Sequence, residues 1–258
     1  MTILETRSLS RRFGGLTAVS ELSFAVEPGE IRGLIGPNGA GKTTTFNVIS
    51  GFYAPTSGRV IYDGRDISGL RTSAIAALGL VRTFQATTLF QELTVLENVL
   101  VGCHLQARIG LIAALVGGNR RAEAAAEDRA HEMLDFFGLL ERAAEPAGNL
   151  PHGLQRALGM AVALVAGPKI LLLDEPFTGM NPEETRHMMD LVRRVRDRGV
   201  TILLVEHDMQ AVMGLCEKIT VLNFGRLLTE GAPEEIRRHP EVIEAYLGSP
   251  QESSGHAA

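Results

Sequence analysis

The chain has 258 residues, of which 45% are hydrophobic and 21% are charged, and its net charge at pH 7 is −5. This composition is typical of one large α/β domain, or of a core domain with a smaller inserted lobe. The acidic balance argues against nonspecific nucleic-acid binding, which needs a basic surface. Its two cysteines, Cys103 and Cys216, lie far apart in the sequence. Without a CxxC spacing they predict buried free thiols rather than a metal site or a disulfide.

Short apolar runs predict strands, and longer helical patterns lie between them. In chain order the runs are Glu21–Val26, Ile31–Ile35, Val60–Tyr62, Leu80–Phe84, Ile170–Leu173, Thr201–Val205 and Ile219–Leu222. The fifth and sixth runs are almost continuously aliphatic, which is typical of central parallel strands covered on both faces. A helix is predicted between them, because Asn181 is a good N-cap and Pro182 suits the first helical position. Its expected apolar stripe is Met188, Leu191, Val192 and Val195.

The middle of the chain has a different character. From about Gln91 to Ala166 strand patterns vanish and helical ones persist, which predicts a helical lobe inserted in a domain of residues 1–248. A helix at Arg120–Phe137 should pack an alanine face inward, made by Ala122, Ala125, Ala126 and Ala130. The short apolar segment Ile109–Gly118 predicts a buried connector, with contact to a membrane partner as the alternative. The small, polar segment Ser249–Ala258 predicts a flexible tail.

A phosphate-binding motif follows the run Ile31–Ile35. Residues 36–43 fit the pattern G-x-x-x-x-G-K-[ST], whose glycines let backbone N–H groups face phosphates at the positive end of the next helix. Lys42 is expected to reach the β- and γ-phosphates, and the Thr43 hydroxyl to bind Mg²⁺. The predicted nucleotide-binding residues here are Gly36, Pro37, Asn38, Gly39, Ala40, Gly41, Lys42, Thr43 and Thr44.

Polar side chains follow three of the other predicted strands. Asp174 and Glu175 end a buried strand, where α/β sheets place ligands. Asp174 would hold Mg²⁺ and Glu175 would orient the attacking water. Such acids alone could also be a helix cap, but the phosphate-binding motif favours catalysis. His207 could reach the γ-phosphate, although a lone histidine after a strand is usually structural. Gln85 precedes the helical lobe and could report the nucleotide state to it, with a surface loop as the alternative.

Together these motifs resemble the nucleotide-binding subunit of an ABC transporter, from about Leu4 to Gly248. The matching elements are the phosphate loop, the glutamine loop at Gln85, the signature region Leu150–Arg156, the acids Asp174–Glu175, the loop Gly179–Pro182 and the switch His207. The resemblance implies an α/β P-loop NTPase fold of the ABC type. Its expected parts are a mainly parallel core sheet, an N-terminal antiparallel β portion and the inserted helical lobe.

The resemblance also implies an ATPase that uses ATP and Mg²⁺. The implied catalytic residues are Glu175, His207 and Gln85, and the implied metal ligands are Thr43, Gln85 and Asp174. Phe13 looks like the aromatic residue on which adenine stacks in this family, a contact that does not discriminate between bases. Gly153, in the signature region, would permit close backbone approach to the nucleotide.

The partners implied are a second ATP-binding subunit, identical or related, and transmembrane permease subunits. In this family each nucleotide lies between the phosphate loop of one subunit and the signature loop of the other. The helical lobe would pass the motion to the permease at the cytoplasmic face of the inner membrane. A periplasmic or lipoprotein substrate-binding protein would act indirectly, and no nucleic acid is expected.

Finer features resemble the ATP-binding subunits of branched-chain amino-acid importers. They are Arg82–Gln85, Asn149–Pro151, Glu206–Met209, Glu230–Ile236 and Glu244–Gly248. This favours the uptake of branched-chain or related amino acids. Lipopolysaccharide-export and urea-import ATPases look similar and are the alternatives.

The signature departs from the usual L-S-G-G-Q, because residues 150–154 read L-P-H-G-L. Pro151 offers neither a hydroxyl nor an N–H to an opposing γ-phosphate. His152 and Leu154 are also less ordinary. A weakly hydrolytic, ATP-dependent scaffold is therefore a second hypothesis. A soluble ABC ATPase acting on DNA or ribosomes is a third, although the basic surface it usually needs is not evident.

Overall fold

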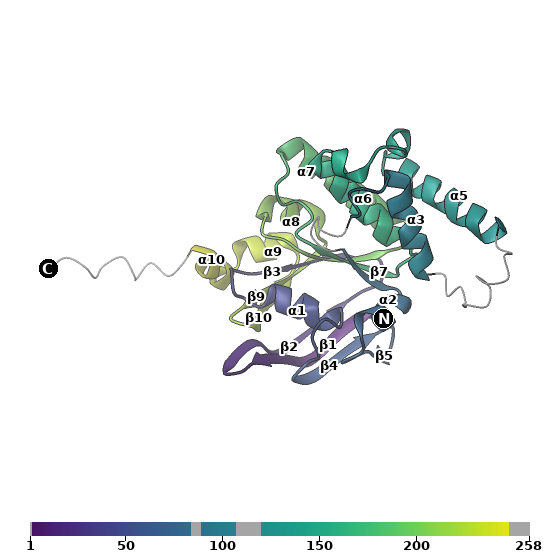
Figure 1. The fold of residues 1–258 in the computed structure, drawn as a ribbon. Coiled ribbons are helices and arrows are strands. Elements are labelled where there is room, and N and C mark those ends of the chain that lie inside the picture. Colours follow the sequence, from purple (N-terminus) through teal and green to yellow (C-terminus); the bar gives the residue numbers. More distant parts are fainter. Residues whose placement is uncertain (1, 84–88, 107–119, 248–258) are drawn as a thin grey trace. The chain divides into compact units, whose positions relative to one another are not determined.

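The computed structural model describes residues 2–83, 89–106 and 120–247 (Figure 1). The chain divides into two compact units: the first comprises residues 1–72 and 201–258, and the second comprises residues 73–200. Gln85, the whole predicted connector Ile109–Gly118 and the predicted tail Ser249–Ala258 lie outside the described residues.

The first unit contains an antiparallel sheet in the order β2-β1-β4-β5. Its strands are β1 (Leu4–Phe13), β2 (Leu16–Val26), β4 (Ser57–Tyr62) and β5 (Arg65–Asp66). The predicted N-terminal antiparallel portion is therefore confirmed. Strand β2 begins earlier than the predicted Glu21, because Leu16 pairs with Phe13 across a tight turn at Gly14 and Gly15. The first residues of β2 are exposed, so no apolar alternation marks this part of the strand.

A second, mainly parallel sheet of the first unit carries the phosphate loop. Strand β3 (Ile31–Ile35) runs parallel to β8 (Thr201–Val205) on one side and to β9 (Lys218–Asn223) on the other. Strand β10 (Arg226–Gly231) then pairs antiparallel with β9. Every residue of β3 and β8 is buried, as expected for central strands covered on both faces.

Four helices follow these strands in the first unit. They are α1 (Lys42–Ile49), α8 (Met209–Leu215), α9 (Pro233–Arg238) and α10 (Pro240–Leu247). Asp208 caps α8, since its Oδ1 accepts hydrogen bonds from the backbone N–H groups of Gln210 (2.9 Å) and Ala211 (3.1 Å). This cap fixes the chain direction directly after the strand end that carries His207.

The second unit is mainly helical. Its strands β6 (Leu80–Thr83) and β7 (Ile170–Asp174) are parallel. The helices are α2 (Thr72–Ala77), α3 (Val95–Gln106), α5 (Arg120–Phe136), α6 (His152–Leu164) and α7 (Pro182–Asp197), with short 3-10 turns at Leu140–Arg142 and Ala147–Asn149. The predicted lobe, residues 91–166, falls inside this unit, and its extent as a separate lobe stays a prediction. Among the described residues, no helix has the length and apolar character needed to cross a bilayer.

The cap and the buried face of α7 agree with the prediction from the sequence. Asn181 caps α7 by accepting hydrogen bonds from the backbone of Glu183 (2.9 Å) and Glu184 (3.0 Å), and the Glu184 carboxylate accepts one from the Asn181 N–H (2.9 Å). The predicted apolar stripe of α7 is buried.

The alanine face predicted for α5 is only partly buried. Ala126 and Ala130 are buried as expected, whereas Ala125 is exposed.

Both cysteines are free and buried, as predicted. Burial is the main reason that the pKa of the Cys216 thiol rises to about 12, with nearby carboxylates adding to the effect. Neither residue is a candidate nucleophile, because a reactive cysteine needs a lowered pKa and exposure.

A buried cation ties three strands of the first unit together. Arg32, on β3, has a side chain that is only 1% exposed. Its guanidinium contacts Glu30 (2.8 Å) and Glu230 (2.6 Å), and it also donates to the Thr220 hydroxyl (3.1 Å). A buried charge is tolerated only when it is paired and hydrogen-bonded in this way.

Replacing Arg32 by Leu should lower the free energy of unfolding by about 3 kcal/mol, because the partly buried carboxylates of Glu30 and Glu230 would lose their cation. Urea unfolding followed by circular dichroism measures the change. The control is Arg59→Leu, which removes an exposed pair with Asp66 (3.7 Å) and should cost about 0.5 kcal/mol or less. Equal losses for the two variants would contradict the importance given to Arg32.

Candidate phosphate-loop nucleotide site

The phosphate loop connects β3 to α1 and is closely surrounded by backbone. Gly36 and Gly41 have φ values of 151° and 97°. A Cβ atom at Gly36 would lie 2.2 Å from the Leu222 carbonyl oxygen, and one at Gly41 would lie 2.5 Å from that of Ala18. Only glycine fits at these two positions, for reasons of both conformation and space.

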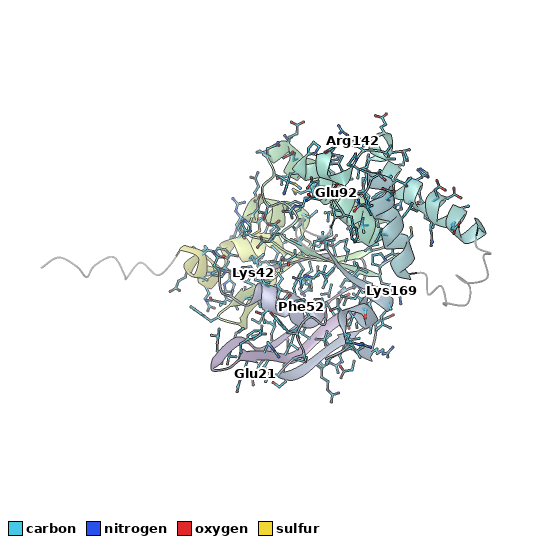
Figure 2. All side chains as sticks on the ribbon, viewed as in Figure 1. Glu21, Lys42, Phe52, Glu92, Arg142 and Lys169 are labelled. Atoms are coloured by element: carbon cyan, nitrogen blue, oxygen red, sulfur yellow. The ribbon has the colours of Figure 1, made fainter. Side chains whose placement is uncertain are left out.

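Lys42 begins α1 (Figure 2), and its side chain contacts the loop that precedes the helix. Its Nζ donates to the carbonyl oxygens of Gly36 (2.6 Å) and Pro37 (3.0 Å). The N-cap of α1, Gly41, supplies no side-chain hydrogen bond, and the first turn holds no acidic residue. The loop thus combines a cation with uncapped backbone N–H groups, which suits an anion such as a phosphate. Thr43 is exposed in the first turn of α1.

His207 follows the strand beside the phosphate loop. Because Leu34 pairs with Val205 in parallel strands, Gly36 and His207 both lie just beyond the carboxyl ends of neighbouring strands. The His207 side chain is 59% exposed, whereas that of Glu206 is 1% exposed. The Glu206 carboxylate accepts hydrogen bonds from the backbone N–H groups of His207 (3.0 Å) and Asp208 (3.4 Å). Glu206 therefore holds the turn that presents the imidazole.

Phe13, the predicted adenine platform, ends β1 and belongs to an aromatic cluster. Its ring lies 5.2 Å from that of Tyr53 in an edge-to-face arrangement. The Arg11 guanidinium lies 4.6 Å from the Phe13 ring centroid and 5.2 Å from that of Tyr53. Phe13 keeps an exposed part, so a flat ring could still stack on it. Arg11 and Tyr53 could not be identified from the sequence, because their contacts depend on the fold.

In the second unit, Asp174 ends β7 and is paired with an arginine. The Nη2 atom of Arg82, on β6, lies 2.5 Å from Asp174 Oδ2, and the two side chains are 6% and 12% exposed. Sequence reasoning noticed Arg82 only as part of a subfamily motif and missed this role. The strand register places Arg82 beside Leu172, which brings its side chain within reach of the strand end.

Glu175 lies in a strained turn that the signature helix supports. Its φ is 49°, an uncommon value for a residue with a side chain. Arg156, on α6, donates to the backbone oxygens of Glu175 (3.0 Å) and Thr178 (3.3 Å). The Thr178 hydroxyl lies 3.4 Å from the Glu175 carboxylate. Backbone strain of this kind is concentrated at functional sites.

The signature region begins α6 without a side-chain cap, since the N-cap is Pro151. A Cβ atom at Gly153 would lie 3.4 Å from Glu184 Oε1, and one at Gly179 would lie 3.8 Å from the His152 ring. The signature region and the loop Gly179–Pro182 therefore adjoin each other within the second unit. Gln155 supports the turn by donating to the Leu150 carbonyl (3.0 Å).

The predicted site residues are thus divided between the units. Phe13, the phosphate loop and His207 belong to the first unit, and Gly153, Asp174 and Glu175 belong to the second. Over the three described ranges, no three His, Cys, Asp or Glu side chains converge on one metal position.

Comparison with known families decides the classification. Residues 19–178, more than half of the chain, match the family described as "ABC transporter". The chain belongs to the ABC transporter family. Residues 226–251 also match the family described as "Branched-chain amino acid ATP-binding cassette transporter". Both resemblances inferred from the motifs are therefore confirmed.

Curated relatives of this ABC protein share nearly its whole length. It is 48% identical to the high-affinity branched-chain amino acid transport ATP-binding protein LivG of Escherichia coli K12, over 95% of this chain and 98% of that protein. BraF of Pseudomonas aeruginosa, with the same description, is 45% identical over the same shares. The lipopolysaccharide export system ATP-binding protein LptB of Escherichia coli K12 is 34% identical, over 96% and 98%.

Solved structures confirm the ABC-type fold. A nucleotide-free ATP-binding cassette from an ABC transporter superposes with a TM-score of 0.86 at 31% identity, over 96% of this chain and all of that one. The ADP conformation of the cassette MJ1267 gives the same TM-score at 30% identity and the same coverage. The predicted α/β P-loop NTPase class is correct.

The ion pair between Arg82 and Asp174 should show strong energetic coupling. In a double-mutant cycle with Arg82→Leu and Asp174→Asn, the stability losses should be non-additive by about 2 kcal/mol, because either substitution alone already removes this ion pair from a buried position. Urea unfolding of the four proteins gives this value. The exposed pair Arg193–Asp190 (2.7 Å) in the same unit is the control, with an expected coupling of about 0.5 kcal/mol or less. Similar coupling at both pairs would argue against a special role for Arg82.

Proposed function

We propose that this chain is the ATP-binding and ATP-hydrolysing subunit of an ABC importer, and that it energises the uptake of branched-chain amino acids through a membrane permease. The observation that carries the proposal is the 48% identity to LivG over nearly the full length of both proteins. The lower identity to LptB, 34%, favours amino-acid uptake over lipopolysaccharide export. The match of residues 226–251 to the branched-chain subfamily supports the same choice.

The phosphate loop is suited to a nucleoside triphosphate. It joins the buried strand β3 to the uncapped start of α1, and in loops of this kind backbone N–H groups bind phosphate oxygens. Lys42 would exchange its contacts with the loop carbonyls for the β- and γ-phosphates, and Thr43 would hold Mg²⁺. The metal, when bound with ATP, neutralises charge on the transferring phosphoryl group. Asp174 and Gln85 are the further proposed metal ligands, and Phe13 the proposed adenine contact.

Glu175 is the proposed group that orients and polarises the attacking water. The Arg156 contacts to the backbone of Glu175 and Thr178 fix the turn from which its carboxylate projects. His207 would hydrogen-bond the γ-phosphate, and the buried Glu206 carboxylate holds the backbone that presents it. Preorganised groups of this kind lower the barrier without rearranging during the reaction.

The proposed partners follow from membership of the ABC transporter family. A second ATP-binding subunit would bring its signature loop, including Gly153, to the phosphate loop of the first. Transmembrane permease subunits would hold the pair at the cytoplasmic face of the membrane, so that the chain is peripheral. A substrate-binding protein would deliver the amino acid to the permease. Differential affinity of ATP for the closed pair would drive closure, and hydrolysis would release it.

Replacing Lys42 by Ala should weaken ATP binding by roughly 10-fold to 100-fold, because a charge-assisted contact to the phosphates is lost. Equilibrium titration of the purified chain with ATP measures the affinity. Lys218→Ala, which removes an exposed lysine from β9 in the same unit, is the matched control and should leave the affinity unchanged. Unaltered binding by the Lys42 variant would refute the assignment of the phosphate loop.

Replacing Glu175 by Gln should keep ATP binding and lower turnover by about 100-fold to 10,000-fold, because the amide cannot polarise water as the carboxylate does. The readout is ATP turnover together with leucine uptake by vesicles that contain the permease complex and its binding protein. Glu183→Gln, at an exposed first-turn acid of α7, is the control. Wild-type turnover in the Glu175 variant would remove its assigned role. If the unaltered complex showed no turnover stimulated by substrate, the scaffold hypothesis would replace the importer.

A further inference from the structure

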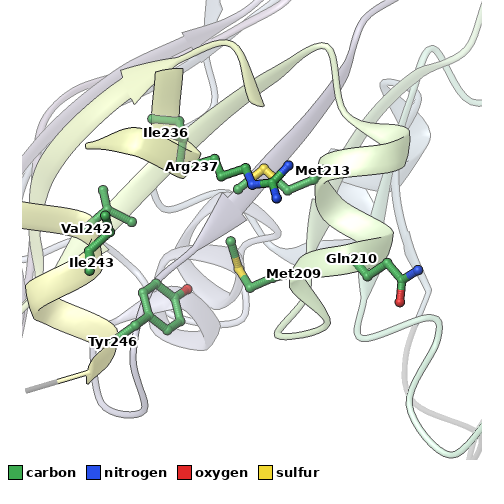
Figure 3. A pocket seen from close by; sticks show the side chains of 8 residues that line it. All are labelled: Met209, Gln210, Met213, Ile236, Arg237, Val242, Ile243 and Tyr246. Atoms are coloured by element: carbon green, nitrogen blue, oxygen red, sulfur yellow. The ribbon is translucent and has the colours of Figure 1, made fainter. Parts of the chain in front are cut away.

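The first unit contains a cavity of about 500 Å³ among α8, α9 and α10 (Figure 3). Its walls are mostly apolar: Met209 and Met213 come from α8, Ile236 from α9, and Val242 and Ile243 from α10. A volume of this size is within the range of small-molecule sites. Methionines adapt readily to ligands of different shape.

Among the described residues of the lining, Arg237 is the one that carries a charge. Figure 3 shows its guanidinium extending from α9 toward Met213 on α8. The next residue, Arg238, instead lies 3.8 Å from Glu234 on its own helix. The remaining polar groups of the lining are the Gln210 amide and the Tyr246 hydroxyl. The described part of the lining contains Arg237 and no carboxylate, so this part carries a positive charge.

This lining selects a chemical class of ligand. An apolar body would be covered by the methionine and aliphatic side chains, and an anionic head would meet Arg237. An amino acid would also bring an ammonium group, and none of the described lining residues is an acid that could pair with it. The complementary ligand is therefore an apolar monocarboxylate without an amino group, such as a branched-chain acid or a medium-chain fatty acid.

The cavity adjoins the phosphate loop through Tyr246. Burial raises the pKa of this phenol, and a hydrogen bond with the Gly36 backbone partly offsets the rise. Gly36 is the first residue of the phosphate loop. On another wall, Met209 begins α8 two residues after His207, and the Asp208 cap joins the two. Both connections lie within the first unit, so a change in the cavity walls can reach the proposed nucleotide site.

We propose that this cavity is a regulatory site for an apolar monocarboxylate, and that its occupancy changes the affinity of the phosphate loop for nucleotide. The second part rests on the proposed nucleotide-binding function, whereas the first does not. Two of the three walls, α9 and α10, belong to the segment that matches the branched-chain subfamily.

Binding is tested on the full chain without nucleotide, by nuclear magnetic resonance of its eight methionines with isotope-labelled methyl groups. Titration with 4-methylpentanoate should shift the signals of Met209 and Met213, while Met160 and Met188 of the second unit stay in place. Leucine is the matched probe, because it differs only by its ammonium group, and it should bind at least about tenfold more weakly. Octanoate distinguishes the two kinds of monocarboxylate. If it binds more tightly than 4-methylpentanoate, the natural ligand is a fatty acid; if it binds more weakly, the natural ligand is a branched-chain acid.

Three variants make the binding test specific. Arg237→Gln should weaken 4-methylpentanoate binding by about fivefold, the upper range for an exposed ion pair. Arg238→Gln, the neighbouring control, should leave it unchanged. Ile243→Trp should fill the cavity and abolish binding, and the unshifted signals of the second unit would show that the variant is folded. Equal binding of leucine and 4-methylpentanoate would contradict the proposed site, and so would equal effects of the two arginine substitutions. It would also be contradicted if the Met209 and Met213 signals shifted with protein concentration alone, because the occupant would then be a second copy of the chain.

Regulation is tested by titrating ATP with and without saturating 4-methylpentanoate. The ATP affinity should change by about fivefold, and ATP should change the affinity for the acid by the same factor. Tyr246→Phe should keep acid binding, because the ring remains, and should remove the coupling. Acid binding with no effect on ATP affinity would overturn the regulatory role. A chain that binds the acid but no ATP at all would instead refute the proposed function.

Discussion

The nucleotide site depends on the close approach of backbone to backbone around the phosphate loop. Gly36 meets the Leu222 carbonyl of β9, and Gly41 meets that of Ala18 in β2, so the loop is held against both sheets of the first unit. Any side chain at either position would push the loop away from these strands. The parallel pairing of β3 with β8 then fixes where His207 lies relative to the loop. One steric constraint therefore sets both the shape of the phosphate cradle and its position in the sheet.

Several charged residues with low solvent exposure stabilise the backbone or the sheet in the two units. Arg32 joins β3 to two acids and stabilises the central sheet. Glu206 uses its carboxylate on backbone N–H groups and so presents the exposed His207. Arg156 braces the strained turn at Glu175 through carbonyl oxygens. In the last two cases the supporting residue adjoins a proposed catalytic side chain in sequence or in space. Such support keeps reactive groups fixed while the groups themselves stay available for substrate.

The sequence predicted the elements whose signal is local. Strands β3 and β8 were found with correct bounds because their aliphatic runs are continuous, and α7 was found because its cap, proline and apolar stripe agree. Strand β1 was missed, since most of its residues are polar and its pairing with β2 and β4 decides its conformation. The partners of Asp174 and Phe13 were missed for a similar reason. Arg82 and Tyr53 reach them only through strand register and chain folding, neither of which is written in a short stretch of sequence.

The pairing of Arg82 with Asp174 bears on how selectively the acidic strand end accepts ions. In the ligand-free chain the carboxylate already shares its charge with a guanidinium, so the pair as a whole is neutral. The neutral pair attracts a free divalent cation only weakly, and the cation would have to displace Arg82 from Asp174. A cation that arrives together with a polyphosphate brings its own anionic ligands and does not need this carboxylate as its sole anchor. If Asp174 is the metal ligand proposed above, this arrangement would disfavour binding of free calcium or zinc and favour the metal–nucleotide complex.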